Sequence, residues 1–441
     1  MRRILGLWLA ICVAVGLIFA GCAPKAEQKQ VQSIKIGVFG PMTYTQGQHS
    51  WYGASIAADE INKAGGVLVA GVKRPVELLK IETNELVNIA DATVAIEKAI
   101  TTDRVDFLVG GYRSEAALAI QDIAARYKKI VMFPPCGHPD VLKRVKENYD
   151  SYKYIFRVGG GCYTGMAMCA NLVPIVVDAV KKELGIARPK IAILAAKVIW
   201  PEPFIAVVKK NAEQWGVEIV GEWRPSALAS DLTAELTAIK AAGAHIIYPC
   251  MDGPQNVVFG KQYGELEIPA AVIGWQVETS DLKYWEATGG KANYEATASL
   301  YSRIKATERS IPFYDKFVQM SGGHSPTQSA ATYTALWLLK GAIEQAGTLE
   351  SDAVVSALEN MQWAAPEGIV KFSTLAKPDQ WGQVHEVLWG PGFASGFGVQ
   401  WQDGNLVTFW PPADGSFGGV IYEGVGAYKL PPRMINYWKG K

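Results

Sequence analysis

The sequence predicts an α/β protein of two doubly wound lobes, each built on a parallel sheet with helices on both faces. Three observations predict this fold class. Apolar strand-like runs alternate with segments of helical spacing, and the alternation occurs in two blocks of similar length. About 400 residues follow the N-terminal leader, which is enough for two substantial domains. A repeated βα pattern is typical of parallel sheets that helices cover on both sides.

The first block predicts four strands and three helices. The strands are short β-branched runs, and Gly or Pro pairs follow several of them. We expect strands at residues 34–39, 76–81, 105–109 and 130–133, and helices at residues 51–63, 89–100 and 116–127. The first helix ends at Gly65-Gly66, which is a typical stop signal.

The second block repeats this pattern, and a different one follows it. We expect strands at residues 191–194, 217–220, 246–248 and 271–273, with helices at residues 203–215, 231–241 and 256–263. Longer helices at residues 328–345 and 352–361 lie outside both blocks. From about residue 368 the pattern suggests antiparallel strands, around residues 384–389 and 397–401, and residues 413–441 form a C-terminal extension.

The N-terminus is an export signal. Arg2 and Arg3 precede an apolar run of about 16 residues, which is short for a membrane-spanning helix. The run ends in Phe19-Ala20-Gly21-Cys22, which resembles the bacterial lipobox. The resemblance implies a signal peptide at residues 1–21, cleavage before a diacylated Cys22, and a flexible tether at residues 22–33. An ordinary signal peptide and an uncleaved anchor are the alternatives, and no later segment looks long and apolar enough to span a bilayer.

The composition indicates a globular protein without a nucleic-acid surface. Hydrophobic residues make up 49% of the chain and charged residues 19%, and the net charge of +1 is well mixed along it. Four cysteines remain after Cys22, and none forms a CxxC pair. They could be buried thiols or disulfides, and the sequence leaves the pairing open. These four are Cys136, Cys162, Cys169 and Cys250.

Enzyme motifs are missing from the sequence. The five histidines form no HxxxH pair, and the chain has neither a GxxxxGK[ST] phosphate loop nor a GxSxG elbow. Residues 159–161 are a Gly run without the framing of a dinucleotide site, so we interpret them as a hinge or turn. Cys136 and His138 lie two residues apart with no orienting partner in view. We therefore expect a protein that is not an enzyme and needs no metal or cofactor.

Ligands of open parallel sheets bind in the crevice beyond the carboxyl ends of the strands. The loops that follow the predicted strands are therefore the candidates for a binding site. They cover residues 40–50, 110–115, 134–139, 195–202, 249–254 and 274–280.

Several segments resemble one known family. Residues 36–43 read Ile-Gly-Val-Phe-Gly-Pro-Met-Thr, and residues 58–66 read Ala-Asp-Glu-Ile-Asn-Lys-Ala-Gly-Gly. With residues 152–157, these resemble in order the type I periplasmic binding proteins of branched-chain amino acid/amide ABC transport, which include leucine-binding-protein-like lipoproteins. The similarity runs from about residue 34 to about residue 411.

The resemblance implies a Venus-flytrap fold in which three crossing strands join two Rossmann-like lobes. Lobe 1 would comprise residues 34–157 and 300–362, and lobe 2 residues 158–299 and 363–412. The ligand would lie between the lobes, and a ligand that touches both favours the closed state. Shifting the closed population from 1:99 to 99:1 needs roughly 5.5 kcal/mol of differential affinity.

The resemblance also implies partners and a location. The closed form would deliver its ligand to the permease and ATPase subunits of an ABC importer, from the periplasm or cell surface. We expect a monomer that contacts the membrane through its lipid anchor alone and binds no nucleic acid. The alternative is a lipoprotein of the same fold that senses a ligand and signals to a membrane receptor, because fold alone does not decide function. A structural surface lipoprotein without a ligand is a third possibility.

In amino-acid binders of this family, hydroxyls and N–H groups after the third strand receive the ligand carboxylate at a helix N-terminus. Ser114 fits that pattern. Glu115 does not, and it could recognise an ammonium group or simply favour the start of its helix. Arg113 could hold a carboxylate as a fork or remain solvated.

The next loop of the family supplies a carbonyl and a hydroxyl to the ligand's amino group. Here Cys136 takes the position of the carbonyl donor residue, and His138 replaces the hydroxyl. An imidazole can donate or accept a hydrogen bond and can change charge near neutrality. Packing within the loop is the alternative role for His138.

Lobe 2 and the first loop provide further candidates. Trp200 stands where the family often has an aromatic residue that closes over the ligand. Asp252 could bind an ammonium group, and Gln276 or Glu278 lies near the family's acidic partner of that group. Tyr44 and His49, in the first loop, are weaker candidates.

These residues make the predicted site more polar than one built for leucine. Buried charges need complementary groups on the ligand. An amino acid, an amide or another small carboxylate would fit. Three tryptophans also leave room for an aromatic ligand: Trp51, Trp200 and Trp275.

Overall fold

The computed structural model describes residues 32–134, 136–159 and 162–440, and the statements below concern these residues. The predicted signal peptide, Cys22 and the tether up to residue 31 lie outside them, as does the side chain of Cys162.

Lobe 1 is built on a sheet of five parallel strands in the order β4-β1-β5-β6-β7. Four of the five strands begin or end within a few residues of the runs that predicted them, and β7 comes from the segment 152–157 that was noted for its family resemblance. The strands are β1 (Ile34–Gly40), β4 (Val76–Glu82), β5 (Phe107–Gly110), β6 (Val131–Phe133) and β7 (Ile155–Arg157).

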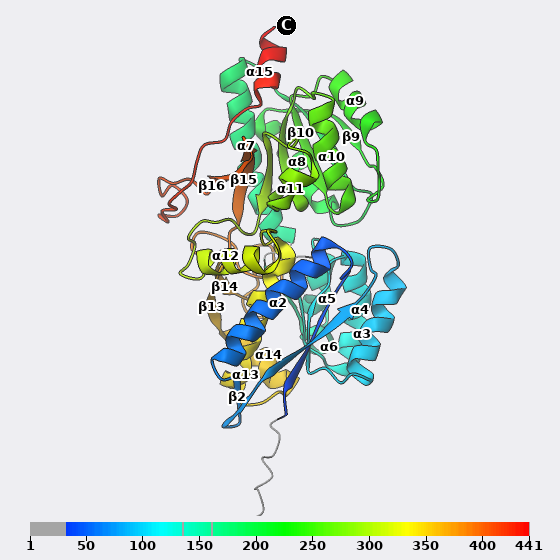
Figure 1. The fold of residues 1–441 in the computed structure, drawn as a ribbon, viewed down its shortest axis with the longest axis vertical. Helices are drawn as coiled ribbons and strands as arrows, with labels where there is room; N and C mark the ends of the chain where they lie inside the picture. Colours follow the sequence, from blue (N-terminus) through cyan, green and yellow to red (C-terminus); the bar gives the residue numbers. More distant parts are fainter. Residues whose placement is uncertain (1–31, 135, 160–161, 441) are drawn as a thin grey trace, which may run out of the picture. The chain divides into compact units, whose positions relative to one another are not determined.

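Helices cover both faces of this sheet (Figure 1). On one face, Val38 and Phe107 pack with residues of α2 (Thr45–Lys63) and α13 (Thr332–Ala346). On the other face, the next residue of β1, Phe39, packs with residues of α3 (Ile89–Thr101) and α4 (Ser114–Tyr127). Neighbouring strand residues thus enter different cores, which explains why the strands read as continuous apolar runs.

Shorter elements complete lobe 1. They are the ribbon β2 (Val67–Val69) and β3 (Val72–Arg74), the helices α5 (Asp140–Glu147), α6 (Tyr149–Tyr152), α12 (Ser310–Met320) and α14 (Ser351–Asn360), the 3-10 turn η2 (Gln328–Ala331), and the ribbon β13 (Gln362–Ala365) and β14 (Gly368–Lys371).

Lobe 2 has seven strands in the order β16-β15-β12-β11-β10-β8-β9. The five from β9 to β12 are parallel, and β15 and β16 join as an antiparallel edge. The strands are β8 (Lys190–Ala195), β9 (Glu218–Trp223), β10 (Ile246–Met251), β11 (Ala271–Gln276), β12 (Glu295–Ser299), β15 (Phe397–Gln402) and β16 (Asn405–Trp410).

The helices of lobe 2 lie on both faces of its sheet. Ile191 and Ile193 of β8 enter one core and the alternating Ala192 and Leu194 the other. The helices are α7 (Cys162–Leu184), α8 (Glu202–Trp215), α9 (Thr233–Ala241), α10 (Pro254–Glu265), α11 (Lys283–Ala287), α15 (Pro432–Lys439) and the 3-10 turn η1 (Glu278–Ser280).

The predicted fold class is confirmed, because both sheets have the doubly wound topology. In each, the second strand lies outside the first and the third lies on its other side, so the order reverses between β1 and β5 and between β8 and β10. Such reversals are the places where ligands bind in open α/β sheets. The chain passes between the lobes after β7, after β12 and before β15.

One part of the predicted lobe division differs from the structure. We expected residues 363–412 in lobe 2, but the segment as far as Ala394 packs in the lobe 1 core through Ala365, Val370 and Val387. The strand expected at residues 384–389 is a single bridge between Phe372 and Val387. The strand expected at residues 397–401 is present as β15. The local alternation of residues gave no sign, however, that the β13–β14 ribbon before it packs on lobe 1.

Helix α7 corrects a second expectation. Among the described residues, Tyr163–Leu184 is long and apolar enough by length and composition to cross a membrane, although we expected no such segment. Met168, Leu172 and Val176 recur at helical spacing and pack in the lobe 2 core, and buried core helices meet the same criterion.

The C-terminal extension packs on lobe 2. Met434 is fully buried, Arg433 donates from Nε to the carbonyl of Ile268 at 3.0 Å, and Trp438 donates from Nε1 to the carbonyl of Pro269 at 2.7 Å. Figure 1 shows α15 beside α7. The extension is therefore part of the folded lobe.

Candidate ligand-binding site

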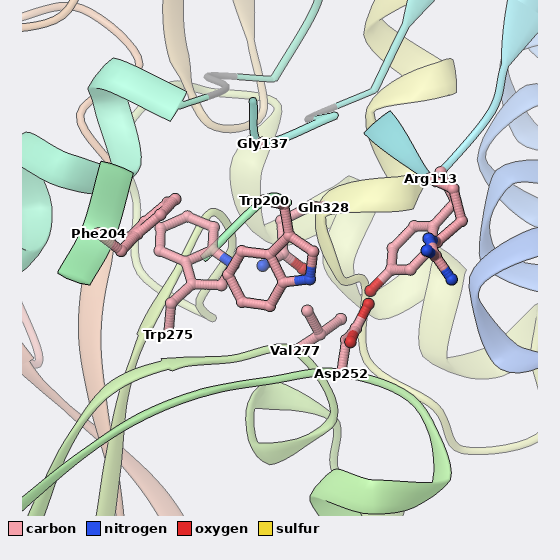
Figure 2. A pocket seen from close by; sticks show the side chains of 9 residues that line it. Arg113, Gly137, Trp200, Phe204, Asp252, Trp275, Val277 and Gln328 are labelled. Carbon is pink, nitrogen blue, oxygen red and sulfur yellow. The ribbon is translucent and has the colours of Figure 1, made fainter. Parts of the chain in front are cut away.

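A pocket lies where the strand ends of the two lobes face each other (Figure 2). Lobe 1 contributes residues after β5 and β6, and lobe 2 contributes residues after β8 and β10 and at the end of β11. Five of the six loops named from the sequence thus reach it or its immediate edge. The lining residues are Tyr112, Arg113, Gly137, Trp200, Phe204, Asp252, Trp275, Val277 and Gln328.

One side of the pocket is aromatic. The rings of Trp200 and Phe204 lie 5.6 Å apart at 83°, and those of Phe204 and Trp275 lie 5.5 Å apart at 53°. Gly137 of lobe 1 closes on this wall, since a Cβ on it would lie 3.3 Å from the Trp200 Cβ. A side chain at position 137 would therefore push the two lobes' surfaces apart.

The other side is charged, and Figure 2 shows Arg113 and Asp252 away from the Phe204 and Trp275 rings. Asp252 is buried, and burial raises the pKa of its carboxyl, against the lowering effects of the Arg113 charge and of hydrogen bonds from Tyr112 and Trp200. Burial, followed by the charge of Asp252, raises the pKa of Tyr112 well above its usual value. Asp252 is the carboxylate that faces the cavity.

Arg113 is already paired. Its Nε and one terminal nitrogen donate to the two carboxylate oxygens of Glu115 at 3.1 and 2.9 Å. Burial alone would raise the pKa of Glu115, but Arg113 lowers it overall. Glu115 also accepts from the backbone N–H of Ile199 in lobe 2 at 3.4 Å. The pair therefore spans the lobes and carries little net charge.

Glu278 lies beside the pocket and forms a second bridge between the lobes. One oxygen accepts from the Gln46 amide of lobe 1 and from the backbone N–H of Gly253 at 2.8 Å. Its other oxygen, Oε2, is buried with no hydrogen-bond partner among the described residues. Burial, followed by the charge of Asp252, raises the pKa of Glu278 well above its usual value.

Three predicted ligand contacts support the wall and do not line the pocket. The Ser114 hydroxyl accepts from the backbone N–H of His138 at 3.1 Å. The carbonyl of Cys136, expected to hold a ligand, accepts from the Arg157 guanidinium at 2.6 Å. His138 is half-buried, and its Nδ1 accepts from the N–H of Asp140 at 3.3 Å. Gly137, between the two predicted residues, is the one that reaches the cavity.

The remaining candidates lie elsewhere. Gln276 is fully buried in lobe 2, where its amide donates to Glu295 at 3.4 Å. Tyr44 precedes α2 at its N-cap, because the expected loop becomes helical from Thr45. His49 is consequently inside α2, and its Nδ1 lies 2.8 Å from the Thr327 hydroxyl. Neither Tyr44 nor His49 lines the pocket.

The sequence analysis missed Phe204 and Gln328. Phe204 follows Trp200 by one helical turn, so an aromatic pair at that spacing was the available signal. Gln328 gave none, because it comes from the last lobe 1 segment and meets the strand-end loops only in the folded chain. Its side-chain oxygen and nitrogen are both buried without hydrogen-bond partners among the described residues.

The cavity is small in this conformation. Its free volume is about 30 Å³, and a water molecule needs roughly 10–15 Å³ on this measure. A ligand with several carbon atoms therefore requires the lobes to separate or a ring to move. Thiol chemistry is not favoured beside it, because burial raises the pKa of Cys136 well above its usual value.

Comparison with known proteins gives consistent results. The sequence profile of the family described as "Periplasmic binding protein" matches residues 33–383. The leucine-, isoleucine-, valine-, threonine- and alanine-binding protein of Pseudomonas aeruginosa is 24% identical, over 77% of this chain and 86% of its own length.

Two solved structures share the fold. A branched-chain amino acid ABC transporter protein from Silicibacter pomeroyi has a TM-score of 0.72 and 21% identity, covering 91% of this chain and all 100% of its own. An ABC transporter solute-binding protein from R. palustris, in complex with benzoate, has a TM-score of 0.69 and 18% identity, covering 90% and 100%.

Proposed function

The chain belongs to the periplasmic binding protein family, and from this premise we propose that it is the substrate-binding lipoprotein of an ABC importer. It would be anchored outside the cytoplasm through Cys22, bind a small polar ligand between its lobes and deliver that ligand to a membrane permease. The export signal in the sequence and the family membership support this proposal.

The polar atoms of the pocket indicate what the ligand must carry. The nitrogen and the oxygen of the Gln328 amide are both buried without hydrogen-bond partners among the described residues. An unpaired buried polar group costs about 1–3 kcal/mol, so a ligand that pairs with these groups gains that energy on binding. The ligand should therefore combine a donor and an acceptor in one small molecule.

The charges favour a nitrogen cation. Asp252 faces the cavity beside aromatic rings, an arrangement that suits an ammonium group through both the carboxylate and cation–π attraction. Arg113 is the cation among the lining residues, and Glu115 already neutralises it. We therefore favour an amino acid or another small amine or amide over a carboxylate without a nitrogen, such as the benzoate of the R. palustris protein.

Both lobes contribute to the pocket, which gives the capture its mechanism. Arg113 and Gln328 come from lobe 1, and Trp200 and Asp252 come from lobe 2. A ligand that contacts all four binds the closed form better than the open form, so it shifts the population toward closure. The closed form would be the one that the permease recognises.

Replacing Asp252 tests the charge assignment. The first step is mass spectrometry of the small molecules released from the purified, denatured protein, followed by calorimetric titration of the compound found. We expect Asp252→Asn to weaken an ammonium ligand at least about 100-fold, because the charge-assisted hydrogen bond is lost in a buried site.

The matched control is Asp178→Asn, an exposed aspartate on α7 of the same lobe, which should leave the affinity unchanged. Equal affinity of Asp252→Asn and the parent would contradict the proposed ligand class. Deleting the gene should abolish uptake of the compound. If the deletion strain still takes up the compound but no longer responds to it, the sensing role would be supported instead.

A further inference from the structure

Beside the pocket, three potential metal ligands from both lobes converge. They are His49 of α2 and His324 of the loop between α12 and η2, both in lobe 1, and Asp281, which follows η1 in lobe 2. One atom of each lies within 4.8 Å of the others. The proposed transport function uses none of the three.

The geometry leaves one nitrogen unused. His324 Nδ1 lies 2.6 Å from Asp281 Oδ2, which is a hydrogen bond. His49 Nε2 points at the same oxygen from 3.7 Å, too far for a hydrogen bond. His49 is 1% exposed, and its Nε2 has no hydrogen-bond partner among the described residues. A buried, unpaired imidazole nitrogen aimed at a carboxylate is a costly arrangement unless something binds there.

A surrounding shell holds these groups in place. The other nitrogen of His49, Nδ1, lies 2.8 Å from the Thr327 hydroxyl, and Asp281 Oδ1 accepts from the backbone N–H groups of Lys283 and Ser325, both at 3.1 Å. Outer hydrogen bonds of this kind orient imidazole and carboxylate ligands at metal sites.

We propose that His49, Asp281 and His324 form a binding site for a zinc-class divalent cation that links the two lobes. Two imidazoles and one carboxylate are the donors that zinc prefers, with a fourth position left for water. Two donors of a tetrahedral zinc ion at about 2.0–2.2 Å are roughly 3.3 Å apart. The observed spacings of 2.6 and 3.7 Å bracket that value, so small side-chain shifts suffice.

Binding has two consequences. The ion displaces the proton between His324 and Asp281 to solvent, so affinity rises with pH. Because the donors come from both lobes, the ion stabilises the closed form and should raise the affinity for the transported ligand, with an equal reciprocal effect on the metal. The two imidazoles disfavour calcium and magnesium, which prefer oxygen ligands.

Zinc titration of the tag-free mature chain tests the proposal. The protein is first treated with a chelator, and Zn²⁺ is then titrated by calorimetry without any small-molecule ligand, with metal content measured by mass spectrometry. We expect one zinc per chain. His324→Gln and His49→Gln should each lower the zinc affinity at least about 100-fold, since each removes one of three protein ligands. Cobalt substituted for zinc should give the visible absorption of a tetrahedral site in the parent only.

His138→Gln is the matched control. His138 is also half-buried and has a carboxylate oxygen of Asp140 3.6 Å from its Nδ1, yet both residues lie in lobe 1. This variant should keep the parent affinity for zinc. Circular dichroism without metal checks that each variant folds. If the variant of the buried His49 does not fold, the variant of the half-buried His324 tests the site alone.

Two results would overturn the site: no stoichiometric zinc in the parent, or zinc bound as tightly by His324→Gln as by the parent. Neither depends on the identity of the transported ligand, so the proposed function stands or fails separately. X-ray scattering with zinc alone should show a smaller radius of gyration for the parent and no change for Asp281→Asn.

Discussion

Two arginine–glutamate pairs stand at strand ends of lobe 1, and their surroundings give them different roles. Arg157, the last residue of β7, and Glu386 are both completely buried and hydrogen-bonded to each other. Arg113 and Glu115, after β5, are partly exposed at the edge of the pocket, and their hydrogen bonds use both carboxylate oxygens. The same chemistry is thus present once inside a core and once at the interface between lobes.

The buried pair positions the pocket wall. Besides Glu386, the Arg157 guanidinium donates to the carbonyls of Cys136 at 2.6 Å and His138 at 3.0 Å, which flank Gly137. The partly exposed pair of Arg113 and Glu115 instead connects to lobe 2 through the N–H of Ile199. Arg157 therefore stabilises the structure of lobe 1, whereas Arg113 acts at the contact between the two lobes.

The largest expected effect is on Arg157. Arg157→Met should lower the free energy of unfolding by about 3–5 kcal/mol, because it removes the guanidinium from the buried Glu386 carboxylate and from the carbonyls of Cys136 and His138. Urea denaturation measures this. Adding Glu386→Leu to the same chain should recover part of the loss, because the unpaired charge is then gone.

The control is Arg303→Met, which also removes two hydrogen bonds to a carboxylate, that of Asp315, in a pair on the surface whose side chains are 60% and 49% exposed. Its cost should stay below about 1 kcal/mol. If the two substitutions lowered the free energy of unfolding by the same amount, the buried pair would stabilise the protein no more than the surface pair does.

A buried glutamate that forms no ion pair with an arginine among the described residues sharpens the comparison. Burial raises the pKa of Glu295 to about 8, and it is hydrogen-bonded to Tyr284 at 3.1 Å. Because the folded pKa exceeds the unfolded value of about 4.5, the folded state holds the proton more tightly. Its contribution to stability is complete below about pH 4.5 and is lost as the pH rises through about 8.

Glu295→Gln should therefore flatten this dependence. Between pH 5 and 8 the parent should lose roughly 3–4 kcal/mol more unfolding free energy than the variant. Denaturation curves at both pH values measure the difference. A parallel pH dependence of the two proteins would mean that Glu295 is ionised in the fold.

The smallest expected effect on stability belongs to Arg113. Arg113→Gln should change the unfolding free energy by less than about 1 kcal/mol, because solvent already screens the pair. It should nevertheless weaken the transported ligand about tenfold, since it frees Glu115 and loosens the contact with lobe 2. Calorimetry and denaturation of one preparation separate the two effects, and a large stability loss without an affinity change would reverse the assigned roles.

Much of the fold was predictable because local pattern reports burial. The strand at residues 34–39 and the helix at residues 89–100 correspond to β1 and α3 within one residue at each end. Doubly wound topology then located the strand-end loops, and Trp200, Asp252 and Arg113 do line the pocket. Helix α7 carried a usable signal as well, since its buried residues recur every four positions.

Side-chain direction within those loops was not predictable. Cys136 and His138 were chosen, and Gly137 between them faces the cavity, because Arg157 draws the neighbouring carbonyls inward. Gln276 ends the correct strand but points toward Glu295. One residue's difference in a loop reverses the direction of a side chain, and pattern alone does not set it.

By itself the sequence determined the two βα series and hence the edge of each sheet at which the pocket lies, because these depend on residues that are neighbours along the chain. Only the tertiary structure decided which residues meet across the lobes. Gln328 reaches the pocket, residues 363–394 cover lobe 1, and His49, Asp281 and His324 converge, because long-range packing brings together segments whose separation along the chain leaves no periodic trace.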